Sequence, residues 1–205
     1  MHAHVVKTMP SSADQQLISE FVLAFSKLND CLAHQRDPDP VHSALAIDDP
    51  DEHGFWYWKP IPMETGRSCL ESIYAKLPGR FPRLYEELVL SYRWAEVDLK
   101  TFTLLANPPS EGLGLLLEQI DRDKHLTKVL EANGYMRFAK GPDIDYDPVC
   151  FDLRRCRQGG DCPIVKLDHE EILCNSRIRE VAELAPSFRN LMMKTIEDAR
   201  TPGTP

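Results

Sequence analysis

Residues 134 to 153 read Gly134-Tyr-Met-Arg-Phe-Ala-Lys-Gly-Pro-Asp-Ile-Asp-Tyr-Asp-Pro-Val-Cys-Phe-Asp-Leu153. The Asn133-Gly134 pair is typical of a helix end, because glycine accepts the left-handed conformation that stops a helix. Two apolar segments follow, at 135–139 and 149–153, and their aromatic and branched side chains predict β-strands. We expect the acidic loop between them to lie at a sheet edge and to display three carboxylates, those of Asp143, Asp145 and Asp147.

Apolar residues recur at helical spacing in several other segments. Helices are predicted at 11–32, 68–77 and 82–92, in two segments over 112–133, and from Pro186 onward. Ser68 and Glu71 have the spacing of a capping box. Alternating apolar and polar residues predict strands at 95–99 with a continuation over 101–105, and at 163–167. Because the later connections are short, these strands favour an antiparallel meander.

The chain length and this order of elements predict the fold class. A chain of 205 residues is long enough for one domain that buries roughly 70% of the surface of its unfolded form. We expect a single α+β domain over 11–200, with a central, mainly antiparallel sheet covered by helices and an additional N-terminal amphipathic helix. Residues 1–10 and 201–205 are predicted to be flexible ends. The proline-rich acidic segment at 37–53 is predicted to be a mobile surface loop.

The charge balance limits the classes of partner. Acidic residues outnumber basic ones by 32 to 24, which gives a net charge of −8. A nucleic acid or an anionic membrane would be repelled overall, so a basic protein is the expected partner. Residues 1–12 lack the features of a secretory signal, and no apolar run reaches transmembrane length. These observations predict a cytoplasmic protein.

The six cysteines are scattered, and a chain of this length can form a core without disulfides. We therefore expect reduced thiols. Cys156 and Cys162 are separated by five residues, which is more than the two to four typical of a zinc knuckle, and no second ligand pair follows. The interpretation favoured here is a hairpin turn at Gly159-Gly160.

The cluster Phe55-Trp-Tyr-Trp58 concentrates four aromatic side chains. It could serve as a binding platform, but packing in the core or at its rim is the favoured interpretation.

Two segments invite a metal-site interpretation. Asp168-His-Glu-Glu171 places a histidine beside three carboxylates, yet it lacks the HExxH spacing of zincins and no second histidine follows. The favoured interpretation is a helix start capped by Asp168, with Glu170 and Glu171 in its first turn. Asp143-Ile-Asp-Tyr-Asp147 begins like a calcium loop, but Pro148 stands where such a loop needs glycine. With no phosphate loop or nucleophile elbow present either, we expect no enzyme, no metal and no cofactor.

Five segments, taken in order, carry a resemblance to a known family. They are Leu77-Pro-Gly-Arg-Phe-Pro-Arg-Leu-Tyr-Glu-Glu-Leu88, Gly134-Tyr-Met-Arg-Phe-Ala-Lys-Gly141, Asp147-Pro-Val-Cys-Phe-Asp152, Ile164-Val-Lys-Leu-Asp-His-Glu170 and Ala185-Pro-Ser-Phe-Arg-Asn-Leu191. Their order resembles the SUKH superfamily, which includes the fungal cell-wall assembly regulator and many bacterial relatives. The resemblance covers about 66–193, and it leaves out the first helix and the acidic loop.

The resemblance implies a non-enzymatic protein-binding module, most specifically an immunity protein that binds and neutralises a toxin domain. An acidic surface suits that role, because toxin domains that act on nucleic acid tend to be basic. The expected partner-binding residues are Asp143, Asp145, Tyr146, Asp147 and Trp94. Two alternatives remain open: a metal-dependent hydrolase that uses Asp168, His169 and Glu170, and a regulatory adaptor protein.

Overall fold

A computed structural model describes residues 12–29, 32–34, 43–142, 144–157 and 161–201. Several predictions lie outside these residues: the flexible ends at 1–10 and 202–205, the first part of the acidic loop, the position of Asp143 and the glycine turn at 159–160.

The centre of the fold is a six-stranded sheet with the order β10-β9-β8-β7-β6-β5, in which every neighbouring pair is antiparallel. Its strands are β5 (Val97–Asp98), β6 (Thr103–Leu104), β7 (Tyr135–Lys140), β8 (Pro148–Asp152), β9 (Ile164–Leu167) and β10 (Glu180–Ala185). The predicted meander over β7, β8 and β9 is confirmed. β10 was not predicted, because a largely exposed edge strand lacks a continuous apolar face.

The helices confirm the helical periodicity read from the sequence. They are α1 (Ser12–Leu28), α3 (Ser68–Tyr74), α4 (Arg83–Ser91), α5 (Gly114–Ile120), α6 (Lys124–Ala132), α7 (His169–Asn175) and α8 (Phe188–Arg200), with a 3₁₀ turn, η1 (Leu153–Arg155). Two details were wrong: α1 ends at Leu28 because Leu32 begins strand β1, and α3 has Arg67 at its cap position with no side-chain cap bond. Among these described helices, none has the length and apolar character required to span a bilayer.

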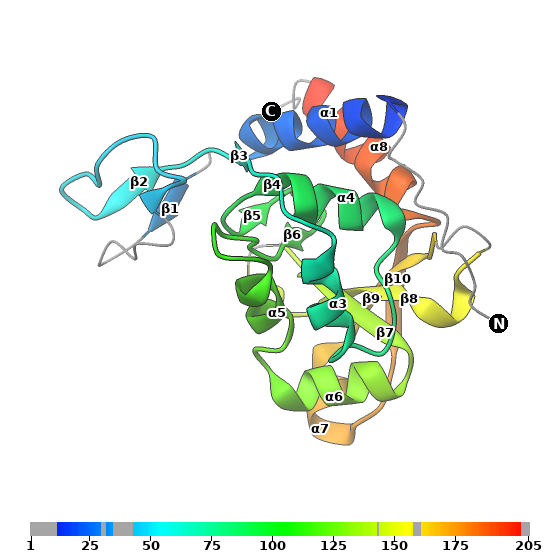
Figure 1. Cartoon of the computed structure of the whole chain (residues 1–205). Coiled ribbons are helices and arrows are strands. Elements are labelled where there is room, and N and C mark those ends of the chain that lie inside the picture. The colour runs from blue at the N-terminus through cyan, green and yellow to red at the C-terminus, as the bar shows by residue number, and fades with distance from the viewer. Residues whose placement is uncertain (1–11, 30–31, 35–42, 143, 158–160, 202–205) are drawn as a thin grey trace.

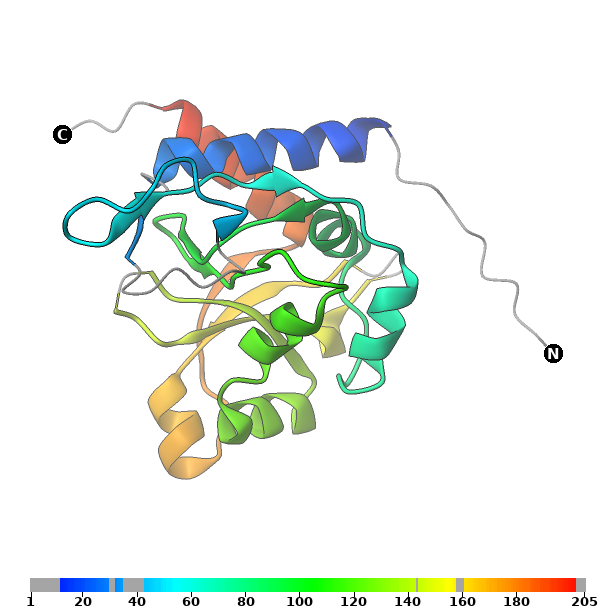
Figure 2. The same cartoon turned by 60° about the vertical axis from the view of Figure 1, so that its left-hand side comes forward.

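Side chains alternate between the two faces of the sheet, and each face has its own helices (Figures 1 and 2). On one face, Phe138 and Phe151 stack at 4.2 Å between ring centroids and meet Tyr85 of α4 and Phe188 of α8. α1 lies along α8 and adds Phe21 to this aromatic core. The opposite face packs on α6 and α7 through a second apolar cluster of Leu126, Leu130, Tyr135, Cys150, Val165, Leu167 and Ile172. The α+β prediction is therefore confirmed.

A separate antiparallel pair, β1 (Leu32–His34) and β2 (Phe55–Tyr57), forms an arm beside the main body (Figure 1). Because side chains alternate between the two sides of a strand, the aromatic cluster at 55–58 divides into two buried and two exposed side chains. Trp56 and Trp58 are buried in the core, whereas Phe55 and Tyr57 are exposed. The expectation of core or rim packing thus holds for the two tryptophans. The last small pair joins β3 (Ile61–Pro62) to β4 (Tyr92–Arg93).

Cys156 and Cys162 form a disulfide, so the prediction of reduced thiols is wrong for this pair. The tertiary cause is the antiparallel course of β8 and β9, which returns the chain and brings the two Cα atoms to 4.1 Å. Cys69, Cys150 and Cys174 are free thiols.

Candidate functional site

The loop that joins β7 to β8 is a compact turn held by its own hydrogen bonds. The Gly141 amide donates to the Asp147 carbonyl at 2.9 Å, and the Asp145 amide donates to the Pro142 carbonyl at 2.9 Å. The Asp147 amide donates to the Asp145 carboxylate at 2.9 Å. A Cβ on Gly141 would lie 2.2 Å from that carboxylate, so a larger residue here would displace the Asp145 side chain from its present position.

Among the described residues of this loop, the carboxylates of Asp145 and Asp147 are paired within the molecule and are not displayed freely. Asp145 lies 3.0 Å from the Lys166 ammonium. Asp147 accepts the His169 amide at 2.9 Å and lies 2.8 Å from the His169 Nδ1. Burial raises the pKa of Asp145, but the Asp147 amide and Lys166 outweigh burial and hold that pKa below its ordinary value. These pairs brace the loop against β9 and α7.

Two other side chains of the loop point to solvent. Ile144 is 85% exposed and Tyr146 is 63% exposed. Tyr146 has its ring centroid 6.3 Å from that of His169 and 5.8 Å from the Lys140 ammonium. Tyr146 was among the predicted partner-binding residues, whereas Ile144 was not. In the sequence, Ile144 stands out only as an apolar residue within an otherwise acidic turn. We call Ile144 and Tyr146 the exposed loop pair.

Trp94 does not belong to this surface, although it was predicted to bind the partner. Its side chain is completely buried, and its indole Nε1 donates to the Leu105 carbonyl at 2.9 Å. Its ring packs at 6.2 Å from that of Phe25 in α1. The reason for the error is tertiary, because α1 covers this position and the local sequence does not reveal that cover.

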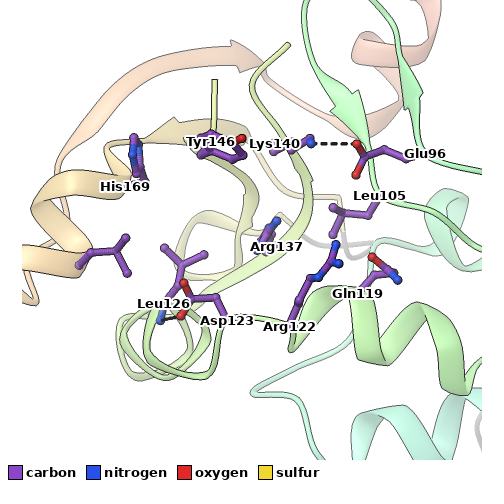
Figure 3. Close-up of a pocket in the computed structure, with 11 residues that line it drawn as sticks. Glu96, Leu105, Gln119, Arg122, Asp123, Leu126, Arg137, Lys140, Tyr146 and His169 are labelled. Carbon is purple, nitrogen blue, oxygen red and sulfur yellow. Dashed lines mark hydrogen bonds and ion pairs between the residues drawn. The ribbon is translucent and has the colours of Figure 1, made fainter. Parts of the chain in front are cut away.

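A pocket of about 500 Å³ lies beside Tyr146, bounded by the start of α6 and by α7 (Figure 3). The residues that line it are Glu96, Leu105, Gln119, Arg122, Asp123, Leu126, Arg137, Lys140, Tyr146, His169 and Leu173. Its volume is within the usual range for small-molecule sites. It was not predicted, because its residues come from elements that are distant in sequence.

An irregularity in β7 brings two cations to this pocket. In a regular strand, Arg137 and Lys140 would point to opposite faces, because they are three residues apart. The register against β8 shifts between Arg137 and Ala139, and this bulge lets both side chains line the same pocket. A bulge adds one residue to the strand and thereby changes which face the following side chains point to.

Three basic side chains, Arg122, Arg137 and Lys140, and two carboxylates, Glu96 and Asp123, line the pocket. Lys140 is paired with Glu96 at 2.8 Å, and Asp123 accepts the Leu126 amide at 2.9 Å as the cap of α6. Desolvation lowers the pKa of Arg137, and the nearby positive charge of Arg122 lowers it further, against the opposing effects of Asp123 and Glu96. The pocket is therefore electropositive within an acidic chain.

The segment considered for a metal site is engaged in other contacts. Asp168 caps α7 by accepting the Glu171 amide at 2.8 Å, as predicted, and it also pairs with Arg179. His169 turns its Nδ1 to Asp147. In the part of the chain that the structure describes, no three His, Cys, Asp or Glu side chains gather as possible metal ligands.

No family model matches the chain, and no curated protein matches it.

Proposed function

We propose that this chain is a non-enzymatic protein-interaction module of the SUKH type, and most specifically an immunity protein that binds and neutralises a toxin domain. The SUKH assignment is supported by the order of the five sequence segments. The observation that carries the interaction role is the exposed loop pair, Ile144 and Tyr146, on a turn braced by ion pairs.

Protein binding is favoured at this loop because the loop loses little conformational entropy when a partner binds. The turn is fixed by three internal hydrogen bonds and by the contacts of Asp145 and Asp147 with Lys166 and His169. A rigid, exposed tyrosine is a frequent hot spot, since it buries a large ring at a low cost in side-chain entropy. In this proposal, Asp145 and Asp147 position the loop, and the exposed loop pair contacts the partner protein.

A basic partner fits the charge of the molecule. The net charge is −8, and exposed carboxylates gather in the turn of the arm at Asp48, Asp49, Asp51 and Glu52. The negative electrostatic potential of these groups accelerates the encounter with a basic surface, and it weakens as salt screens it.

The experiment is affinity capture from the lysate of the source cell, with this protein as bait at low and moderate salt. Bound proteins are identified by mass spectrometry, and the affinity of the captured protein is then measured for variants. We expect one stoichiometric basic protein, and we expect Tyr146→Ala to weaken its binding by about thirtyfold, as for a hot-spot residue.

Tyr57→Ala is the matched control, since Tyr57 is an exposed tyrosine on the arm. Equal binding by wild type and Tyr146→Ala would reject the loop as the interface. A loss with Tyr57→Ala alone would move the interface to the arm. The identity of the captured protein separates a toxin domain from a regulatory target.

A further inference from the structure

Two arginines in the pocket of Figure 3 have no direct ion-pair or hydrogen-bond partner among the described residues. Within the described residues, neither Arg122 nor Arg137 forms an ion pair or a side-chain hydrogen bond, and the Nε of Arg137 is buried without a partner. Buried donors are normally satisfied, because an unpaired one loses its hydrogen bonds to water and gains none in return. The two pocket carboxylates do not supply the missing acceptor, because Glu96 pairs with Lys140 and Asp123 caps α6.

We infer that this pocket binds a small organic anion, whose phosphate or carboxylate group is held by Arg122 and Arg137. Figure 3 shows both arginines directed into the same space, one from β7 and the other from the turn before α6. A guanidinium presents a planar fork of donors that matches the oxygens of either group. One bound oxyanion would satisfy the buried Nε and relieve the repulsion between the two arginines.

The remaining walls suit the organic part of such a ligand. Leu105, Leu126 and Leu173 supply apolar surface, and the Tyr146 ring lies at the rim. A volume of about 500 Å³ accommodates more than a bare ion. The two arginines thus select the charged group, and the leucines contact the body of the molecule.

This inference goes beyond protein recognition and does not depend on it. Arg122 and Arg137 lie outside the loop of Ile144 and Tyr146, so their variants test the pocket without changing the exposed loop pair. Loss of anion binding with intact partner capture, or the reverse, would separate the two proposals.

The test is a titration of the full chain with inorganic phosphate and with citrate at millimolar concentrations, against sodium chloride at matched ionic strength. Calorimetry gives the affinity, and nuclear magnetic resonance follows the Nε–H signal of Arg137 directly. We expect saturable binding and a shift of that signal. Arg122→Gln and Arg137→Gln should each weaken binding by about tenfold or more, the effect of losing a charged hydrogen bond.

Lys128→Gln is the control, since Lys128 is exposed on α6 and its loss changes the net charge equally. Stronger binding of phosphate would indicate a phosphate ester as ligand, and stronger binding of citrate would indicate a carboxylate. The inference is rejected if the probes act no differently from chloride, or if Lys128→Gln weakens binding as much as Arg122→Gln. Arg122 is exposed, so its variant should fold even if Arg137→Gln does not.

Discussion

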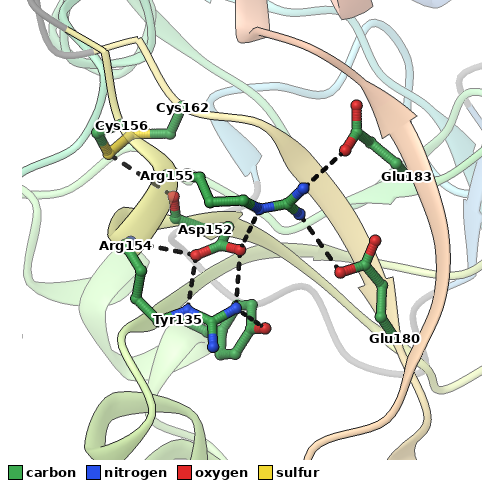
Figure 4. A network of polar contacts seen from close by, with 8 residues as sticks. All are labelled: Tyr135, Asp152, Arg154, Arg155, Cys156, Cys162, Glu180 and Glu183. Carbon is green, nitrogen blue, oxygen red and sulfur yellow. Dashed lines mark hydrogen bonds and ion pairs between the residues drawn. A yellow bond between two sulfur atoms is a disulfide. The ribbon is translucent and has the colours of Figure 1, made fainter.

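The Asp152 carboxylate, completely buried at the end of β8, accepts hydrogen bonds from two arginines (Figure 4). Arg154 donates from its amide and its Nε, and Arg155 donates from its Nε at 2.7 Å. Arg155 extends the network to β10, where it reaches Glu183 at 2.9 Å and Glu180 at 3.3 Å. One buried carboxylate therefore connects β8, η1 and the edge strand.

The pKa of Asp152 leads to a stability prediction. Burial raises this pKa, but the hydrogen bonds from Arg154 and Arg155 outweigh burial and lower it to about 2. Because the folded-state pKa lies below the unfolded value of about 4, the stabilisation is present above that unfolded value. It is lost as the pH falls towards 2. We expect Asp152→Asn to lower the free energy of unfolding by about 3 kcal/mol at neutral pH, measured by urea denaturation.

The pH dependence supplies the decisive comparison for Asp152. The difference between wild type and Asp152→Asn should shrink as the pH falls from about 4 towards 2, because protonation removes the same charge from the wild type. Asp198→Asn is the control, since Asp198 is exposed on α8. A constant difference at every pH would show that packing, not charge, explains the loss.

At the scale of elements, the disulfide closes the connection between η1 and β9. Cys156 follows η1, Cys162 precedes β9, and the Cys156 Sγ lies 3.7 Å from the Asp152 carbonyl. Because the disulfide closes only a short loop, it restricts the conformations of the unfolded chain moderately. We expect the double variant Cys156→Ser with Cys162→Ser to lose about 2 kcal/mol of unfolding free energy, and reduction of the wild type to have the same effect. Urea denaturation with and without reductant measures both.

Cys174→Ser is the control for effects that do not involve the disulfide, since Cys174 is an exposed free thiol. Its stability should be unchanged, and reductant should lower it as much as it lowers the wild type. If reductant left the wild type unaffected, the disulfide would not contribute to stability.

At the scale of the whole molecule, α1 belongs to the same core as the 66–193 segment, although the SUKH resemblance leaves it out. Phe21 meets Phe188 of α8 at 6.1 Å, and Phe25 meets Trp94 at 6.2 Å. Both phenylalanines are completely buried. We expect Phe21→Ala to lower the free energy of unfolding by about 3 to 5 kcal/mol, and unfolding to remain one transition. Tryptophan fluorescence and circular dichroism should give the same midpoint.

The matched control lies on the same helix. Leu23 is 65% exposed, so Leu23→Ala should change stability by less than about 0.5 kcal/mol. Two separate unfolding transitions in Phe21→Ala would mean that α1 is an independent addition to the fold. A loss of unfolding free energy as small as that of Leu23→Ala would mean the same.

The sequence by itself determined the features that depend on neighbouring residues. Helical periodicity located the helices within a few residues, and Gly134 adopts the positive φ of 75° that a helix stop requires. The Asp168 cap and the strands β7, β8 and β9 could be read in the same way. Each of these follows from backbone preference and local hydrogen bonding, which act within a few residues.

Only the tertiary structure decided which side chains meet and which are covered. It buried Trp94 beneath α1, paired Asp145 with Lys166, and left Ile144 exposed. It also joined Cys156 to Cys162, and it brought Arg122 and Arg137 to one pocket, which Lys140 joins through the bulge in β7. The physical reason is that contacts between distant segments depend on register and packing, which are set when the sheet and its helices assemble and which no local pattern encodes.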